Sequence, residues 1–193
     1  MVVLIWSLMV GLCAAQSLEL SLDAGSKSLS AGAHYRYDLY NGYLKAGLVG
    51  IYTDDGGTEY KWGALRVVAG NDTILEGLTC EVGVKGLLGD AENASHSGDV
   101  GAMGFTIHAG YTFPKKLIPI PIEVFSDLTY APDLLSFQDT EKYLEGSIGV
   151  GVHIIKNASL TLTYTAYDVD MENGPGDWSL DEEVLRAGIV MRF

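Results

Sequence analysis

Cysteine is nearly absent from this chain of 193 residues, which contains only Cys13 and Cys80. Cys13 lies in an apolar N-terminal stretch that is expected to be removed, so the mature chain would keep a single thiol. One thiol can build neither a disulfide framework nor a cysteine-based metal site. Cys80 is therefore interpreted as a small apolar side chain.

Basic residues and long apolar runs are also scarce. The chain has 12 Lys and Arg against 25 Asp and Glu, which gives a formal net charge of -13. A nucleic-acid partner needs a basic surface, so this charge argues against one, while cations and basic ligands remain open. Beyond the N-terminus no apolar run reaches the length of a membrane-spanning helix, so no such helix is expected in the mature chain.

Residues 1–15 have the pattern of a secretory signal peptide. Val2 to Leu12 form an apolar core, and Cys13-Ala14-Ala15 supplies the small residues that a signal peptidase recognises. Cleavage is expected before Gln16, which leaves residues 16–193 as one domain. No Lys or Arg follows Met1, and a truncated start would explain this departure from the usual pattern.

From Ser17 onward, apolar side chains recur at every second position. In 158–169, for example, Leu162 belongs to an apolar set and Thr163 to a polar set, and in a strand these sets face opposite sides. Segments 43–52 and 59–68 carry apolar residues on both faces, so their facing stays open. The expected strands are 18–23, 28–37, 43–52, 59–68, 79–88, 103–113, 122–130, 143–154, 158–169 and 185–193.

The chemistry of the two faces separates a membrane barrel from a soluble sandwich, which also alternates. The polar face is rich in glycine and carries isolated charges of both signs, whereas the apolar face is bulky over about ten residues, enough for a tilted strand to cross a bilayer. Bulky apolar side chains on the outer face and charged side chains on the inner face indicate an all-β fold, a transmembrane antiparallel up-and-down β-barrel. Ten strands are expected, and eight would remain if the first hairpin pairs loosely.

Charged residues on the predicted inner face are expected to form a network that fills the lumen. A barrel of this size is just wide enough for side chains, and unpaired charges there are costly, so pairing across the lumen would plug it. Glu123 and Glu145 are expected to reach Arg186. The network comprises Glu19, Arg36, Glu81, Lys85, Glu123, Asp127, Glu145, Arg186 and Arg192.

The connections between strands suggest an orientation. The odd-numbered ones (24–26, 53–57, 89–99, 132–140 and 171–181) are mostly long and acidic, and the even-numbered ones (39–41, 70–72, 114–119 and 156–157) are mostly short. Long outer loops and short periplasmic turns are typical of outer-membrane barrels. This places the chain in the bacterial outer membrane, in contact with lipid and lipopolysaccharide.

The last strand ends in Phe193, with apolar residues at every second position before it. An aromatic residue at the periplasmic interface anchors such a strand, and the alternate positions meet lipid. The pattern resembles the C-terminal signal that the barrel-assembly machinery of Gram-negative bacteria recognises. Its residues are Leu185, Ala187, Ile189, Met191 and Phe193.

The C-terminal half also resembles the YfaZ family of outer-membrane proteins. The resemblance rests on Leu128 to Phe137, which includes a Tyr130-Ala131-Pro132-Asp133 turn, on Tyr143-Leu144-Glu145, on Tyr167 to Gly174 and on the terminal strand. It implies a barrel at the cell surface and no established activity. No catalytic residue is carried over from it.

No cofactor is expected, although Asp168, Asp170 and Glu172 begin like a calcium loop. The match to an EF-hand fails because Asn173 stands where glycine is required and Ser179 stands at the twelfth position. A loosely bound Ca²⁺ or Mg²⁺ at the acidic outer loops is the alternative to a plain acidic turn. The predicted inward residues His34, His108 and His153 are interpreted as solvated lumen residues rather than a zinc site.

Three functions remain open. The leading hypothesis is a plugged barrel with acidic surface loops and a structural or surface-interaction role. The second is a narrow, porin-like channel for small solutes or ions, which the polar inner face favours. The third is a surface enzyme of the omptin type. It is disfavoured because it needs an Asp-His pair at the outer rim, where His96 is the only histidine in the predicted loops.

Overall fold

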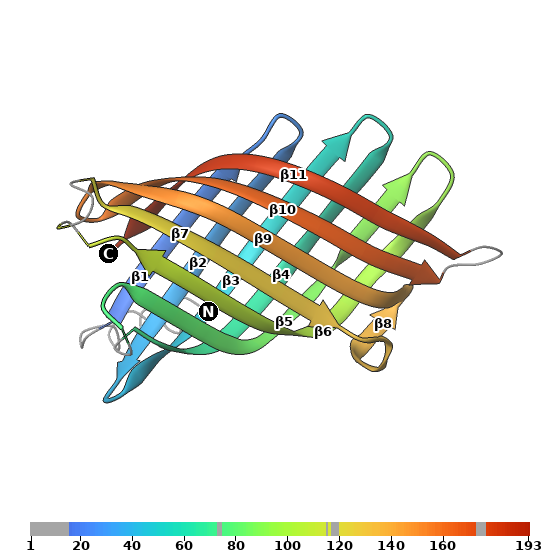
Figure 1. The fold of residues 1–193 in the computed structure, drawn as a ribbon. Helices are drawn as coiled ribbons and strands as arrows, with labels where there is room; N and C mark the ends of the chain where they lie inside the picture. Colours follow the sequence, from blue (N-terminus) through green and yellow to red (C-terminus); the bar gives the residue numbers. More distant parts are fainter. Residues whose placement is uncertain (1–15, 73–74, 115, 117–119, 173–176) are drawn as a thin grey trace, which may run out of the picture.

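Ten long strands form a closed antiparallel barrel, and this confirms the predicted fold class and strand number (Figure 1). The computed structural model describes residues 16–72, 75–114, 116, 120–172 and 177–193, so the predicted signal peptide lies outside the described residues. The strands are β1 (Gln16–Ala24), β2 (Ser28–Leu39), β3 (Gly42–Asp55), β4 (Thr58–Asn71), β5 (Leu78–Asn93), β6 (Ser97–Thr112), β7 (Ile122–Ala131), β9 (Thr140–Ile155), β10 (Ala158–Glu172) and β11 (Asp177–Arg192).

A short additional strand, β8 (Ser136–Gln138), pairs with the part of β6 that lies beyond the end of β7. The 3-10 turn η1 (Asp133–Leu135) follows β7 and leads into β8. Along β6, Phe105 pairs with Tyr130 of β7 and Ala102 pairs with Ser136 of β8, so β8 continues the line of β7. No helix among the described residues is long and apolar enough to cross a membrane.

The first and last strands close the barrel. β1 pairs with β11 from Glu19↔Arg192 to Ala24↔Ala187, and it pairs with β2 on its other side. Phe193 then exchanges two backbone hydrogen bonds with Leu18, of 2.8 and 3.1 Å. Closure gives each of the ten long strands two paired neighbours, so none of these described strands is an edge strand. We call the end that carries the C-terminus the terminal end and the opposite one the distal end.

Side chains alternate between the wall and the lumen as predicted. Leu162 faces outward and is 46% exposed, while Thr163 faces the lumen. The structure also shows which side chains of segments 43–52 and 59–68 face the lumen, a question that the sequence left open. On β3 and β4, Lys45 and Arg66 face the lumen, whereas Leu48 and Leu65 face outward.

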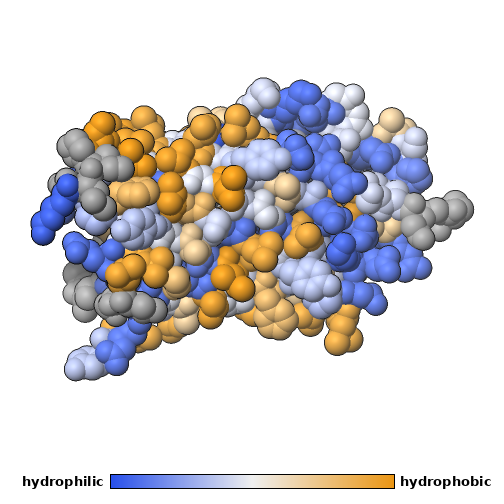
Figure 2. All heavy atoms as spheres, viewed as in Figure 1, coloured by the Kyte–Doolittle hydropathy of each residue, from blue (hydrophilic) through white to orange (hydrophobic). Residues whose placement is uncertain are grey.

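The chemistry of the two faces reverses along the barrel axis. In the terminal half the outward side chains are apolar and the lumen is polar. In the distal half Val169 and Met171 are buried in the lumen while Asp168 and Asp170 face outward from the same strand. Figure 2 shows apolar residues concentrated on the left, at the terminal end, and hydrophilic residues on the right.

This reversal corrects the predicted loop asymmetry. The expected outer loop 89–99 is mostly strand, because β5 runs to Asn93 and β6 begins at Ser97. At the terminal end, β6 ends at Thr112 and β7 begins only at Ile122. Most of the acidic residues that suggested loops, such as Asp90 and Glu92, belong to strands that continue beyond the apolar part of the wall.

The facing of β10 generates a testable contrast between neighbouring residues. Leu162→Arg should cost roughly 2–4 kcal/mol of folding free energy in lipid, because it places a charge on the apolar outer wall. Thr163→Arg should cost less, because it points into the polar lumen. Urea titrations of both variants in lipid vesicles measure the difference, and equal costs would contradict the assigned facing.

Candidate functional site

The lumen is the candidate site, and an apolar core fills its distal half. Tyr60, Trp62, Tyr143 and Tyr167 form its centre, with Tyr60 stacked on Trp62 at 4.4 Å between ring centroids. Trp62 also meets Tyr167 edge-on at 5.4 Å. Smaller apolar residues pack around the rings, namely Ile51, Ala64, Leu87, Ala91, Val100, Ala102, Ala131, Val169, Met171, Leu180 and Val184.

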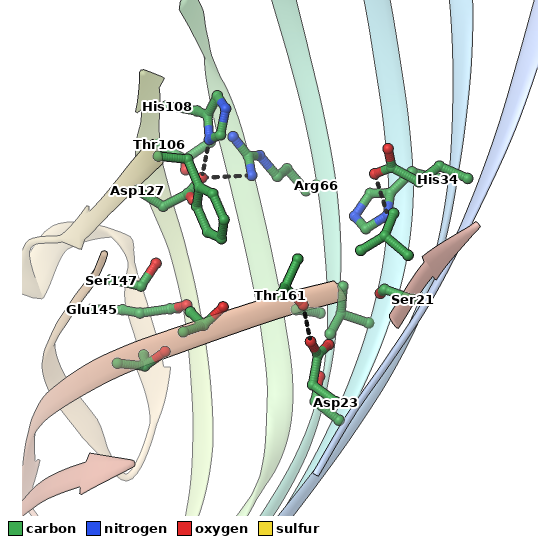
Figure 3. A pocket seen from close by; sticks show the side chains of 18 of the residues that line it. Ser21, Asp23, His34, Arg66, Thr106, His108, Asp127, Glu145, Ser147 and Thr161 are labelled. Carbon is green, nitrogen blue, oxygen red and sulfur yellow. Dashed lines mark hydrogen bonds and ion pairs between the residues drawn. The ribbon is translucent and has the colours of Figure 1, made fainter. Parts of the chain in front are cut away.

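A polar chamber occupies the lumen below this core. Its volume is about 280 Å³, and charged and hydroxyl side chains from most strands line it (Figure 3). A second cavity of about 240 Å³ shares part of this lining and reaches Ser17, Thr79 and Thr112. Those residues lie close to the strand ends at the terminal end, so the chamber leads toward that end of the barrel.

Arg66 links two carboxylates on the chamber wall. Its Nη1 donates to Asp127 at 2.9 Å and its Nη2 donates to Glu81 at 3.1 Å. The Tyr43 hydroxyl also donates to Glu81 at 2.8 Å, and His108 Nδ1 lies 3.0 Å from Asp127. Figure 3 shows Arg66, His108 and Asp127 converging from three strands. Sharing two carboxylates among three partners offsets the cost of placing them in a narrow lumen.

Four more charged pairs line the chamber. Glu19 accepts from Lys45 at 3.2 Å and from Arg192 at 2.9 Å. Lys85 donates to Glu145, which also accepts from the Tyr143 hydroxyl at 2.5 Å. Glu123 lies 3.5 Å from His153 Nε2. Lys85 and Glu145 meet from the non-adjacent strands β5 and β9, whereas Glu19 and Arg192 lie opposite each other on the neighbouring strands β1 and β11.

Two residues of the predicted network behave differently from the expectation. Arg36 lies at the terminal mouth, where it donates to Asp38 at 2.6 Å and Asp72 at 2.8 Å. Arg186 forms no ion pair with Glu123 or Glu145, whose charged partners are His153 and Lys85, respectively. Its guanidinium instead donates to the hydroxyls of Ser28, Thr165 and Tyr167 at 3.2, 3.1 and 3.0 Å.

Sequence reasoning missed Lys45 and Arg66, the cations that hold three of the lumen carboxylates. Both lie on the segments whose facing the alternation left open. The pairing of β2 with β3 carries the signal that was missed. Lys45 lies opposite Arg36, which was predicted to face inward, and directly opposed residues share a face. The apolar core was missed as well, because Ile51, Tyr60, Trp62 and Ala64 lie on those same two segments.

The candidate metal ligands lie in a strand rather than a loop. Asp168, Asp170 and Glu172 belong to β10 and point away from the lumen, with Lys142 Nζ 3.4 Å from both Asp168 and Asp170. The Lys142 ammonium group therefore contacts both carboxylates, and attraction to Asp168 raises the pKa of Lys142. Within the described ranges, no three His, Cys, Asp or Glu side chains are arranged to hold a metal ion.

The histidine of the distal rim is engaged with an aromatic residue. His96 stacks on Trp178 at 5.9 Å between ring centroids. Within the part of the chain that the structure describes, no ion pair joins His96 to a carboxylate. The Asp-His arrangement that an omptin-type enzyme needs is therefore not formed at this histidine.

The predicted assembly-signal residues share the outer face of β11. Leu185, Met191 and Phe193 are exposed, and Ala187 and Ile189 lie on the same side between them. Their side chains extend the apolar wall to the terminal end. This placement fits an assembly signal, and that role stays a prediction.

Comparisons with known proteins give similarity of shape and little else. No protein-family model matches the chain, and no curated protein matches it, so the YfaZ resemblance stays a prediction. The NanC porin is similar over 92% of this chain and 99% of its own, with 11% identity and a TM-score of 0.45. Neisserial surface protein A shares 13% identity over 92% of this chain and 94% of its own, with a TM-score of 0.40. No function is taken from these likenesses.

The position of Arg66 predicts a large loss of stability on its removal. Arg66→Ala should lower the free energy of unfolding by about 3 kcal/mol, because Glu81 and Asp127 would keep their charges without their main partner. Arg36→Ala should cost less, because its partners are exposed to solvent at the mouth. Urea unfolding of both refolded variants tests this, and similar losses would argue against a dominant role for the Arg66 pairs.

Proposed function

We propose that the chain is an integral β-barrel of the bacterial outer membrane. The observation that carries this proposal is the apolar outer wall of the terminal half, where large side chains stand exposed on every strand. They include Leu20, Leu44, Leu65, Val82, Ile107, Val124, Ile148, Leu162 and Leu185. In water such a continuous surface would drive aggregation, whereas in a bilayer it meets acyl chains.

The two ends of the barrel support one orientation. Secretion with a removable signal peptide, followed by insertion through a C-terminal signal read by the barrel-assembly machinery, leaves Phe193 at the periplasmic interface. The distal half then stands outside the membrane, where its acidic outer face meets the lipopolysaccharide layer. Divalent cations such as Ca²⁺ or Mg²⁺ would bridge these carboxylates to lipopolysaccharide phosphates.

Packing within the lumen favours a structural or surface-interaction role over conduction. The aromatic core of Tyr60, Trp62, Tyr143 and Tyr167 crosses the distal half, with each ring at most 3% exposed. Among the described residues, apolar side chains packed in this way would hinder the passage of ions through the distal half. The core would therefore close the distal half of the lumen, in addition to the charge network that the sequence predicts for the plug.

A narrow channel is the second candidate, and the polar chamber is the observation that favours it. Conduction would require the distal core to move aside, since the chamber ends at Arg186 and Tyr167. The two functions differ in one measurable property, the steady conductance of the folded protein.

Planar-bilayer recordings separate the two candidates. The refolded mature protein should show little or no steady conductance, and Trp62→Ala combined with Tyr167→Ala should raise it by opening the distal core. The matched control, Tyr43→Ala, removes a buried tyrosine at the terminal end and should leave the lumen closed. A large, stable, open wild-type channel would overturn the closed barrel and promote the channel.

Deletion of Phe193 tests the proposed route of assembly. It should reduce the amount of heat-modifiable barrel in outer-membrane fractions without blocking secretion, because an interface aromatic and the end of the recognition pattern are lost. Deletion of a distal residue such as His96 serves as the control. Unchanged assembly after loss of Phe193 would contradict its role in the signal.

A further inference from the structure

Among the described residues, two charged side chains of the polar chamber have no oppositely charged group within ion-pair distance. Asp23 and Arg186 both line the 280 Å³ chamber, and within the described residues they alone among its charged side chains form no ion pair. Asp23 accepts one hydrogen bond, from the Thr161 hydroxyl at 3.3 Å (Figure 3). Arg186 is only 6% exposed and contacts hydroxyl groups.

The backbone would allow these two residues to meet, yet their side chains diverge. Asp23 lies opposite Gly188 in the β1–β11 pair, and Arg186 is two positions along on the same inward face. Residues placed diagonally in this way are within reach of long side chains. The Asp23 carboxylate instead lies over Gly188, where a Cβ would collide with it, and Arg186 turns toward Thr165 and Tyr167.

The unused bonding capacity of each group defines the chemistry of a ligand. A guanidinium has five N–H donors, and three hydrogen bonds to hydroxyls leave some free for a carboxylate. The Asp23 carboxylate can accept several more bonds and is suited to an ammonium group. A simple anion at Arg186 would be repelled by Asp23, and a simple cation at Asp23 would be repelled by Arg186.

We propose that the chamber binds a small zwitterion of the amino-acid type. Its carboxylate bonds to Arg186 and its ammonium group bonds to Asp23, while hydroxyls such as those of Ser21 and Thr163 surround it. The ligand enters from the terminal end through the second cavity, because the apolar core above Arg186 closes the other side. The chamber is smaller than pockets that hold drug-sized molecules, which limits the ligand to a few heavy atoms.

Isothermal titration of the refolded barrel in micelles tests the proposal with three matched probes. L-alanine carries both charges, propionate keeps only the carboxylate, and ethylamine keeps only the ammonium group. L-alanine should bind about tenfold or more tightly than either analogue, since each analogue leaves one buried charge unpaired. Propionate binding as tightly as L-alanine would overturn the zwitterion site, and so would the absence of L-alanine binding.

Substitutions test which residue binds each charged group of the ligand. Asp23→Asn should remove the preference for L-alanine over propionate, and Arg186→Gln should weaken both. The control Asp168→Asn makes the same change on the outer face and should alter neither affinity. If Arg186→Gln fails to refold, as judged by heat-modifiable migration, Asp23→Asn decides alone, and an unchanged preference in it refutes the site. A closed, folded barrel that binds no probe refutes this site and leaves the proposed outer-membrane role intact.

Discussion

Closure of the sheet is the constraint on which the rest of the structure depends. In a barrel every second side chain must enter the lumen at every height, whatever surrounds the outer wall at that height. Within a bilayer the wall must be apolar, which leaves polar residues for the lumen. Beyond the bilayer the wall must be polar, so apolar residues are free to fill the lumen. The strands of this protein run long enough to obey both conditions, as Leu162 and Asp170 on β10 illustrate.

The two halves of the lumen are packed on different physical grounds. The distal half is an ordinary apolar core, held by stacked rings and aliphatic contacts. The terminal half relies on paired charges and on glycines that make room for large neighbours. A Cβ at Gly149 would collide with the Phe125 ring, and one at Gly47 would collide with the His34 ring. Small residues opposite large ones let a narrow lumen hold rings and ion pairs together.

Arg186 marks the boundary between these two fillings. It donates to Tyr167, which belongs to the apolar core, and it also lines the polar chamber below. A buried cation held by neutral hydroxyls is less fully compensated than the Arg66 guanidinium, which contacts two carboxylates. The chamber therefore ends in a positive group with bonding capacity to spare, and this feature gives the closed end of the lumen its chemical character.

The sequence by itself determined the alternation, the ten strands and the facing wherever the two faces differ, as at Leu162 and Thr163. It could not show where that difference reverses. β4 carries Arg66 and Trp62 on one face because it crosses the height at which the lumen changes from polar to apolar. Only the tertiary structure fixes that height, and only it joins Lys85 on β5 to Glu145 on β9. Contacts across a lumen depend on strand tilt and side-chain reach, which no local pattern encodes.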